Sequence, residues 1–271
     1  MRGDKFVFGT FQVKEKAILK NLVCRCLEVG VKTFDTAPSY QTESFLGEIL
    51  SEIFANTGNR RTDISVQTKI DGWQMQESRG NIHSHVHNAL HKMQLDYFDT
   101  VFIHWPFPEF LTETWNSLIE LKRSGLIRNI GLCNVRQRHV IKLQNTTNVL
   151  PDVIQIECHP LRNAKKEIQF FHSNYIKVQA YSPLCRMDTR VSNSEVLKRI
   201  AMAHGCTLVQ VVMRWHYQNG VLPVFMTKKV ERIKDNTGIE DISLSQKEMN
   251  AIDNMDINYN AFVESMCCPG F

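Results

Sequence analysis

The chain has 271 residues, of which 43% are hydrophobic and 22% are charged, and its formal net charge is +4 at pH 7. This length and composition suit one large globular domain, and we expect a single domain over residues 1–271. Lys and Arg form no basic stripe, which argues against a nucleic-acid partner. The charged start runs into a short apolar segment that is too short for a signal or membrane span, so we expect a cytoplasmic protein without a membrane partner.

Short apolar runs rich in β-branched and aromatic residues recur along the chain, each followed by a stretch with helical spacing. This alternation predicts parallel strands joined by crossover helices. Eight such runs predict closure into a (β/α)8 TIM barrel of the α/β class. The predicted strands cover residues 6–11, 32–36, 64–69, 100–105, 128–133, 153–158, 177–182 and 221–227.

The gaps between these runs carry amphipathic patterns of the kind that the outer layer of a barrel requires. One gap, from residue 193 to 220, is long enough for two helices. The sequence has no linker rich in Gly, Ser or Pro and no shift in composition. Nothing in it therefore indicates a domain boundary. The predicted helices include residues 17–29, 43–54, 79–93, 111–123, 196–204 and 208–219.

Four reactive side chains stand at the ends of neighbouring predicted strands, where the active site of such a barrel lies. Asp35 ends the second strand and Tyr40 follows five residues later, while Lys69 closes the third strand and His104 the fourth. Each residue alone is typical of turns, caps or half-buried surfaces. Because neighbouring strand ends converge on one mouth, we expect the four side chains to meet there.

Together these residue types suit proton donation to a carbonyl oxygen. A phenol with a free pKa near ~10 is a poor acid at neutral pH unless a cation stabilises the phenolate. Lys69 supplies such a cation, and Asp35 can hold it charged and oriented. His104 can hydrogen-bond the substrate oxygen while Tyr40 donates the proton.

Three segments resemble the aldo-keto reductase family, and the resemblance runs over nearly the whole chain. They are FDTAPSYQTESFLGEIL, DISVQTKI and ALHKMQLDYFDTVFIHWP. By this resemblance, Asp35, Tyr40, Lys69 and His104 match the catalytic tetrad of the family. The resemblance implies an enzyme that reduces an aldehyde or ketone by hydride transfer from a nicotinamide cofactor, with Tyr40 as general acid.

The same resemblance implies a cofactor site beyond the tetrad. Asn134 and Gln155 match the residues that hold the nicotinamide carboxamide, although Cys133 precedes Asn134 where the family usually has Ser. Tyr181, followed by Ser182, matches the aromatic residue that stacks on the nicotinamide ring.

The segment VFMTKKVERIKDNTG resembles the family stretch that binds the adenosine phosphate and adenine. In this alignment Met226 takes the place of a phosphate-binding Lys. Because a guanidinium can pair with phosphate, NADP(H) stays favoured, with NAD(H) as the alternative. The residues implied in this stretch are Thr227, Arg232, Asp235 and Asn236.

Apolar residues at the predicted strand ends suggest a substrate pocket suited to apolar or aromatic carbonyl compounds. We expect a small-molecule substrate and a monomeric protein. The pocket candidates are Phe11, Trp73, Trp105 and Phe107.

Two features of the sequence leave a metal-binding alternative to consider. His83, His87 and His91 recur at intervals of four on a predicted helix, but this spacing lacks an enclosed ligand set, so we expect a solvated helix face. The eight cysteines form no C-x-x-C pair and lie at no zinc spacing with His, so we expect reduced, mostly buried thiols and no metal.

Three alternatives to a general reductase stay open at this point. A dedicated biosynthetic ketoreductase would turn over simple aldehydes feebly. A regulatory or sensor subunit would bind the cofactor with little turnover. A structural barrel would not use the cofactor, which conflicts with the complete tetrad.

Overall fold

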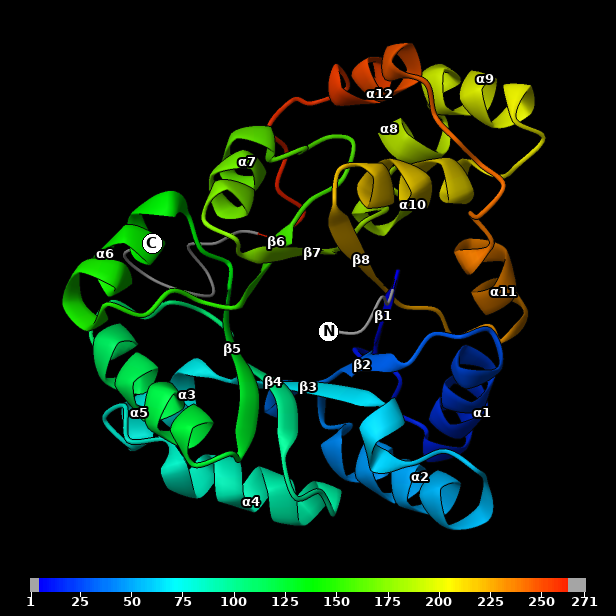
Figure 1. Cartoon of the computed structure of the whole chain (residues 1–271). Coiled ribbons are helices and arrows are strands. Elements are labelled where there is room, and N and C mark those ends of the chain that lie inside the picture. The colour runs from blue at the N-terminus through cyan, green and yellow to red at the C-terminus, as the bar shows by residue number, and fades with distance from the viewer. Residues whose placement is uncertain (1–4, 263–271) are drawn as a thin grey trace.

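Eight parallel strands close into a barrel surrounded by helices in the computed structural model, which describes residues 5–262 (Figure 1). Each strand pairs with the next in sequence, and β8 pairs with β1, so the predicted (β/α)8 barrel is confirmed. The strands are β1 Val7–Gly9, β2 Thr33–Asp35, β3 Ser65–Ile70, β4 Phe98–Ile103, β5 Ile127–Cys133, β6 Val153–Glu157, β7 Lys177–Tyr181 and β8 Val221–Phe225.

Helices cover the outside of the barrel between the strands (Figure 1). Their apolar faces pack on the strands, which is what the amphipathic spacing predicts. The α-helices are α1 Lys16–Glu28, α2 Glu43–Asn56, α3 Gly72–Glu77, α4 His83–Met93, α5 Leu111–Arg123, α6 Gln137–Thr147, α7 Lys165–Ser173, α8 Thr189–Ser192, α9 Glu195–Ala203, α10 Leu208–Gln218, α11 Glu231–Thr237 and α12 Gln246–Asp253. Three 3-10 turns complete the secondary structure: η1 Pro38–Tyr40, η2 Arg61–Asp63 and η3 Cys185–Met187.

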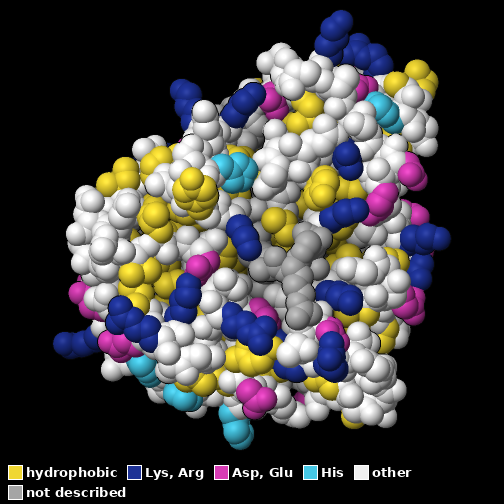
Figure 2. Space-filling view, in the orientation of Figure 1, with side chains coloured by type: hydrophobic (Ala, Val, Ile, Leu, Met, Phe, Trp, Pro, Cys, Tyr) yellow, Lys and Arg dark blue, Asp and Glu magenta, His cyan; other side chains and the backbone are white. Residues whose placement is uncertain are grey.

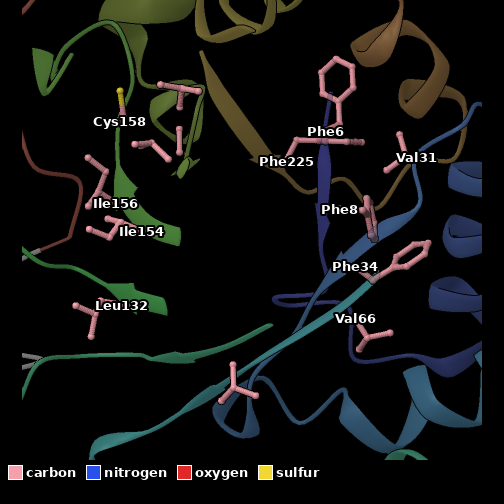
Figure 3. Packing of buried hydrophobic residues seen from close by; sticks show 14 of the residues in the cluster. Phe6, Phe8, Val31, Phe34, Val66, Leu132, Ile154, Ile156, Cys158 and Phe225 are labelled. Carbon is pink, nitrogen blue, oxygen red and sulfur yellow. The ribbon is translucent and has the colours of Figure 1, made fainter. Parts of the chain in front are cut away.

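On β2 and β3, the strand register turns Phe34 and Val66 outward and Asp35 and Gln67 into the barrel. Phe8, Phe34 and Val66 are register neighbours on β1, β2 and β3, and all three are fully buried in the core cluster (Figure 3). Because side chains alternate along a strand, the next position on each strand faces the barrel interior. On β2 and β3 these positions are Asp35 and Gln67, which lie opposite each other in the register. The alternation therefore directs polar side chains into the barrel next to its mouth.

Backbone hydrogen bonds continue the ladder just beyond the strands and fix the loop residues of the site. The amide of His104, one residue after β4, donates to the carbonyl of Ile70 at 2.9 Å. The amide of Asn134, one residue after β5, donates to the carbonyl of Gln155 at 3.0 Å. Residues that follow neighbouring strands are thus held side by side.

The predicted element that differs most from the structure is the helix after β3. The helix predicted over residues 79–93 begins only at His83, and a separate short helix, α3, precedes it. Arg79 and Gly80 both adopt positive φ angles, of 49° and 86°, which end a helix. A Cβ atom on Gly80 would lie 2.4 Å from the Cβ atom of Glu113, so this turn also needs glycine for space.

The surface seen in Figure 2 carries Lys and Arg side chains interspersed with Asp and Glu. Within residues 5–262, no single helix is long and apolar enough to cross a membrane, although α9 and α10, bent by 88°, pass such a test as a pair. The six described cysteines are all free, and Cys26, Cys133, Cys158 and Cys185 are buried. Cys267 and Cys268 lie outside the described residues.

Candidate functional site

A cavity of about 560 Å³ opens at the carboxyl ends of the strands, where the sequence predicts the active site. Three of the four predicted catalytic residues line it, while Lys69 lies buried behind them. Gly9 at the end of β1 also lines it, and its missing side chain leaves room in the cavity. The lining comprises Gly9, Phe11, Gln12, Asp35, Ser39, Tyr40, His104, Trp105, Asn134, Gln155, Tyr181, Ser182, Pro183, Leu184, Arg186, Met187, Val224, Phe225, Met226 and Phe262.

A buried ion pair lies beneath this cavity. Lys69 Nζ lies 2.6 Å from Asp35 Oδ1, and the two side chains are 0% and 3% exposed. Lys69 also donates to the carbonyl oxygen of Thr36 at 3.0 Å. Burial alone would lower the pKa of Lys69, but Asp35 and the nearby phenol oppose this and hold the pKa above its usual value. Lys69 is therefore a permanent cation in the site.

Tyr40 is the last residue of η1 and places its ring between this cation and the cavity. Lys69 Nζ lies 4.7 Å from the centre of the Tyr40 ring. Burial raises the pKa of the Tyr40 phenol, and the charge of Lys69 counteracts part of that rise. Tyr40 is thus protonated at neutral pH and has a fixed cation beside it that can stabilise a phenolate.

His104 lies against Tyr40 on the cavity wall, with the two rings edge to face and their centres 5.8 Å apart. Its Nδ1 atom hydrogen-bonds Oδ1 of Asp71, the residue that follows β3. Burial lowers the pKa of His104; Asp71 raises it and Lys69 lowers it further, so the net pKa lies below the usual value. Sequence reasoning missed Asp71, although its position two residues after Lys69 places it at the same strand end.

The predicted carboxamide residues are held by hydrogen bonds that determine what they can still bind. Tyr181 donates from its hydroxyl to Asn134 Oδ1 at 2.7 Å, and Asn134 Nδ2 donates to the carbonyl oxygen of His104 at 2.9 Å. Gln155 Nε2 donates to Asp35 Oδ2 at 3.0 Å and to Gln179 Oε1 at 2.9 Å. Gln155 therefore has its carbonyl oxygen left to accept a bond, and Asn134 has one N–H left to donate. One acceptor and one donor beside an aromatic ring fit a nicotinamide carboxamide.

The segment predicted to bind the adenosine end follows β8 and lies outside the cavity lining. Thr227 is buried, and its hydroxyl accepts from the amide of Lys229 at 3.1 Å. Arg232 and Asp235 are exposed on α11, and Asn236, on the same helix, is half-buried. Exposed side chains on a helix next to the mouth can reach a ligand that extends out of the barrel.

The four predicted pocket residues separate into two groups. Phe11 and Trp105 line the cavity, and the Phe11 ring lies 5.0 Å from the Tyr40 ring. Trp73 and Phe107 do not line it. Trp73 is 55% exposed on α3 and contacts His85, while Phe107 packs over Gly72, which has no side chain to fill that space.

The cavity has apolar lining residues that the sequence alone did not indicate. They come from the loop after β7 and from the end of the described chain, far in sequence from the tetrad. Phe262 lies 5.6 Å from Tyr181 between ring centres, and its backbone amide donates to buried Glu157. No local pattern marks such residues, because the fold alone brings them to the mouth. The additional apolar residues are Leu184, Met187 and Phe262.

Two of the four histidines of α4 lie close to acidic side chains. His83 Nε2 lies 3.0 Å from Glu120 Oε2 on α5, and His85 Nε2 lies 4.0 Å from Glu77 Oε2. Within residues 5–262, no group of three or more His, Cys, Asp or Glu side chains is arranged to hold a metal ion.

Comparisons with known proteins agree with this architecture. Residues 5–257 match the model of the aldo/keto reductase family. The chain is 31% identical to methylglyoxal reductase DkgA of Escherichia coli O157:H7 over 92% of this chain and 88% of that protein. It is also 31% identical to glyoxal reductase of Bacillus subtilis over 92% and 87% of the two chains. A solved structure of a Bombyx mori aldo-keto reductase in complex with NADP superposes with a TM-score of 0.88 at 25% identity, covering 97% and 92% of the two chains.

These findings identify the class of the protein as a (β/α)8-barrel oxidoreductase that reduces carbonyl groups with a nicotinamide cofactor. The chain belongs to the aldo/keto reductase family.

Proposed function

We propose that the protein reduces small aldehydes with NADPH and that Tyr40 donates the proton. The observation that carries this proposal is the Lys69–Asp35 ion pair behind Tyr40. A fully buried cation at the base of the cavity stabilises a negative charge that develops on the phenol oxygen. It lets a phenol with a raised pKa act as an acid during the reaction and recover its proton afterwards.

The residues around Tyr40 divide the remaining tasks of the reaction. When bound, the nicotinamide supplies the hydride for the carbonyl carbon. Tyr40 gives its proton to the carbonyl oxygen, and Lys69 stabilises the phenolate that remains. His104 lies beside Tyr40 on the cavity wall and contacts the same oxygen. Asn134 donates its remaining N–H to the carboxamide, and Gln155 accepts from the carboxamide with its carbonyl oxygen. The ring of Tyr181 contacts the nicotinamide ring.

Arg232 supports the preference for NADPH over NADH. Its guanidinium is exposed on α11 and always charged, and it can form two parallel hydrogen bonds to a 2′-phosphate. Met226 cannot contribute to such a site, but Lys228 and Lys229 follow on the same loop and are exposed. We therefore propose that this loop and Arg232 bind the adenosine phosphate.

The substrate proposal combines the relatives with the cavity. The relatives named above reduce methylglyoxal or glyoxal, which are small and reactive. Around the mouth, Phe11, Trp105, Met226 and Phe262 offer apolar surface to a larger substituent. We propose reactive aldehydes as the substrate class, with aromatic aldehydes accepted at the mouth.

Steady-state oxidation of NADPH and of NADH with methylglyoxal and with benzaldehyde tests this function. We expect turnover of both aldehydes and a higher kcat/KM with NADPH. Tight cofactor binding without turnover of either aldehyde would contradict the proposal and indicate a sensor. Efficient turnover of an elaborate ketone alone would indicate a dedicated biosynthetic reductase.

A further inference from the structure

Asp71 is a buried carboxylate that the proposed proton transfer does not use. It follows the last residue of β3 and is 6% exposed. Its Oδ2 atom accepts a hydrogen bond from the amide of Ser39 at 2.8 Å, and its backbone amide donates to Gln74 Oε1 at 2.9 Å. These bonds hold Asp71 between η1 and α3. The Oδ1 atom of its carboxylate hydrogen-bonds Nδ1 of His104.

This contact determines where the proton sits on the His104 ring. A carboxylate can only accept hydrogen bonds, so Nδ1 of His104 must carry a hydrogen and donate it to Asp71. The pKa of Asp71 lies below its usual value, although burial opposes this, because His104 and Ser39 stabilise the charged form. Asp71 is therefore ionised at neutral pH. In a neutral imidazole with Nδ1 protonated, Nε2 holds a lone pair and has no hydrogen.

The lone pair changes which substrate oxygen His104 can contact. A carbonyl oxygen needs a hydrogen-bond donor, and Nε2 donates only when the ring is an imidazolium. An alcohol hydroxyl can instead donate to the neutral Nε2 atom. The two forms of the ring thus suit the two directions of the reaction.

We propose that Asp71 is a positioning residue that fixes the His104 tautomer, so that carbonyl reduction depends on the protonated ring. This inference rests on the proposed function of the site. Tyr40 still transfers the proton and His104 contributes only a hydrogen bond, so the proton balance of the reaction is unchanged. Reduction is then favoured as the pH falls, and alcohol oxidation is favoured with a neutral ring.

The charges around His104 determine where this dependence lies on the pH scale. Asp71 and Lys69 face it from the end of β3, Asp35 from β2, and the Tyr40 ring from η1. The net effect lowers the pKa of His104, mainly through burial. The donor form is complete below the shifted pKa and declines tenfold per pH unit above it. We therefore expect kcat/KM for reduction to fall as the pH rises through a value below the usual pKa of histidine, near ~6.5.

Asp71→Asn is the matched test, because it keeps the shape and removes the charge. The Asn oxygen can still accept from the Ser39 amide, which turns the NH2 group toward Nδ1 of His104. Nδ1 must then accept, and the hydrogen moves to Nε2 of the neutral ring. We expect the variant to lose the fall with pH and to exceed the wild type in reduction at pH 8 by at least ~30-fold, because pH 8 lies about 1.5 units above the usual pKa of histidine near ~6.5 and the donor form declines tenfold per unit.

Two further measurements separate positioning from a structural effect. In 15N NMR of the protein with NADP bound, with the His104 signals assigned by their loss in His104→Gln, we expect unprotonated Nε2 in the wild type at pH 8 and protonated Nε2 in Asp71→Asn. The pH profile should be flat in His104→Gln, and Asp71→Asn should change nothing further in that background. Protonated Nε2 in the wild type at pH 8, or the same pH profile in Asp71→Asn and wild type, would overturn the proposal.

The NMR result does not depend on turnover. If Tyr40→Phe stayed active, the proposed role of Tyr40 would fail while the tautomer could still be read. If Tyr40→Phe were inactive and the tautomer were wrong, the inference about Asp71 alone would fail.

Discussion

Lys69 Nζ and Asp35 Oδ1 lie 2.6 Å apart with both side chains buried, directly behind the Tyr40 ring. A buried ion pair is costly to form, because both charges leave water. In the proposed mechanism, this pair places the cation beside Tyr40 before the phenol loses its proton. The predictions below follow from this arrangement.

Asp35→Asn is expected to destabilise the fold by about 3 kcal/mol, since it leaves the Lys69 cation buried without its counter-charge. Chemical denaturation measures this change as a lower unfolding midpoint. Glu195→Gln is the control, because it removes a surface pair in which Glu195 and Lys198 are 87% and 49% exposed. That change should leave the midpoint nearly unchanged. Equal shifts in the two variants would contradict the buried-pair interpretation.

Arg232→Ala is expected to raise the KM for NADPH by about tenfold and to leave the KM for NADH nearly unchanged, because only NADPH carries the 2′-phosphate. Lys234→Ala is the matched control, since Lys234 is another exposed cation on α11. It should change neither KM. A loss that was equal for both cofactors would show that Arg232 does not contact the 2′-phosphate.

Trp105→Ala is expected to lower kcat/KM for benzaldehyde by roughly tenfold and to affect methylglyoxal less, because the larger substrate loses an apolar wall. Trp73→Ala provides the comparison, since Trp73 is 55% exposed and does not line the cavity. It should leave both substrates unaffected. If Trp73→Ala produced the larger loss, the pocket would extend toward α3.

The sequence predicts the barrel well because each strand combines a short apolar run with an adjacent helical pattern. It misplaces the start of the helix after β3, where Arg79 and Gly80 turn the chain with positive φ angles. Gly80 is the local signal for that turn, but an apolar pattern that continues past it suggests one longer helix.

The proximity of Asp35, Tyr40, Lys69 and His104 is also predictable from the sequence, since strand ends of a barrel converge on one mouth. Asp71 is harder to recognise, because an Asp before a short helix is typical of a cap. Its contact with His104 depends on the backbone bond from the His104 amide to Ile70, which pairs the ends of β3 and β4. Phe262 contacts Tyr181 although the two residues are far apart in the sequence, and no local pattern encodes that contact.

Single-turnover reduction of methylglyoxal by the NADPH complex of Tyr40→Phe tests the central claim most directly. This change removes the donated proton and keeps the ring. Tyr217→Phe, on exposed α10 surface, is the control and should behave as the wild type. We predict a rate at least ~100-fold lower in Tyr40→Phe, with an unchanged Kd for NADPH, because positioned general acids contribute about that much. A rate within roughly twofold of the wild type, at equal cofactor occupancy, would contradict the role of Tyr40 as the proton donor.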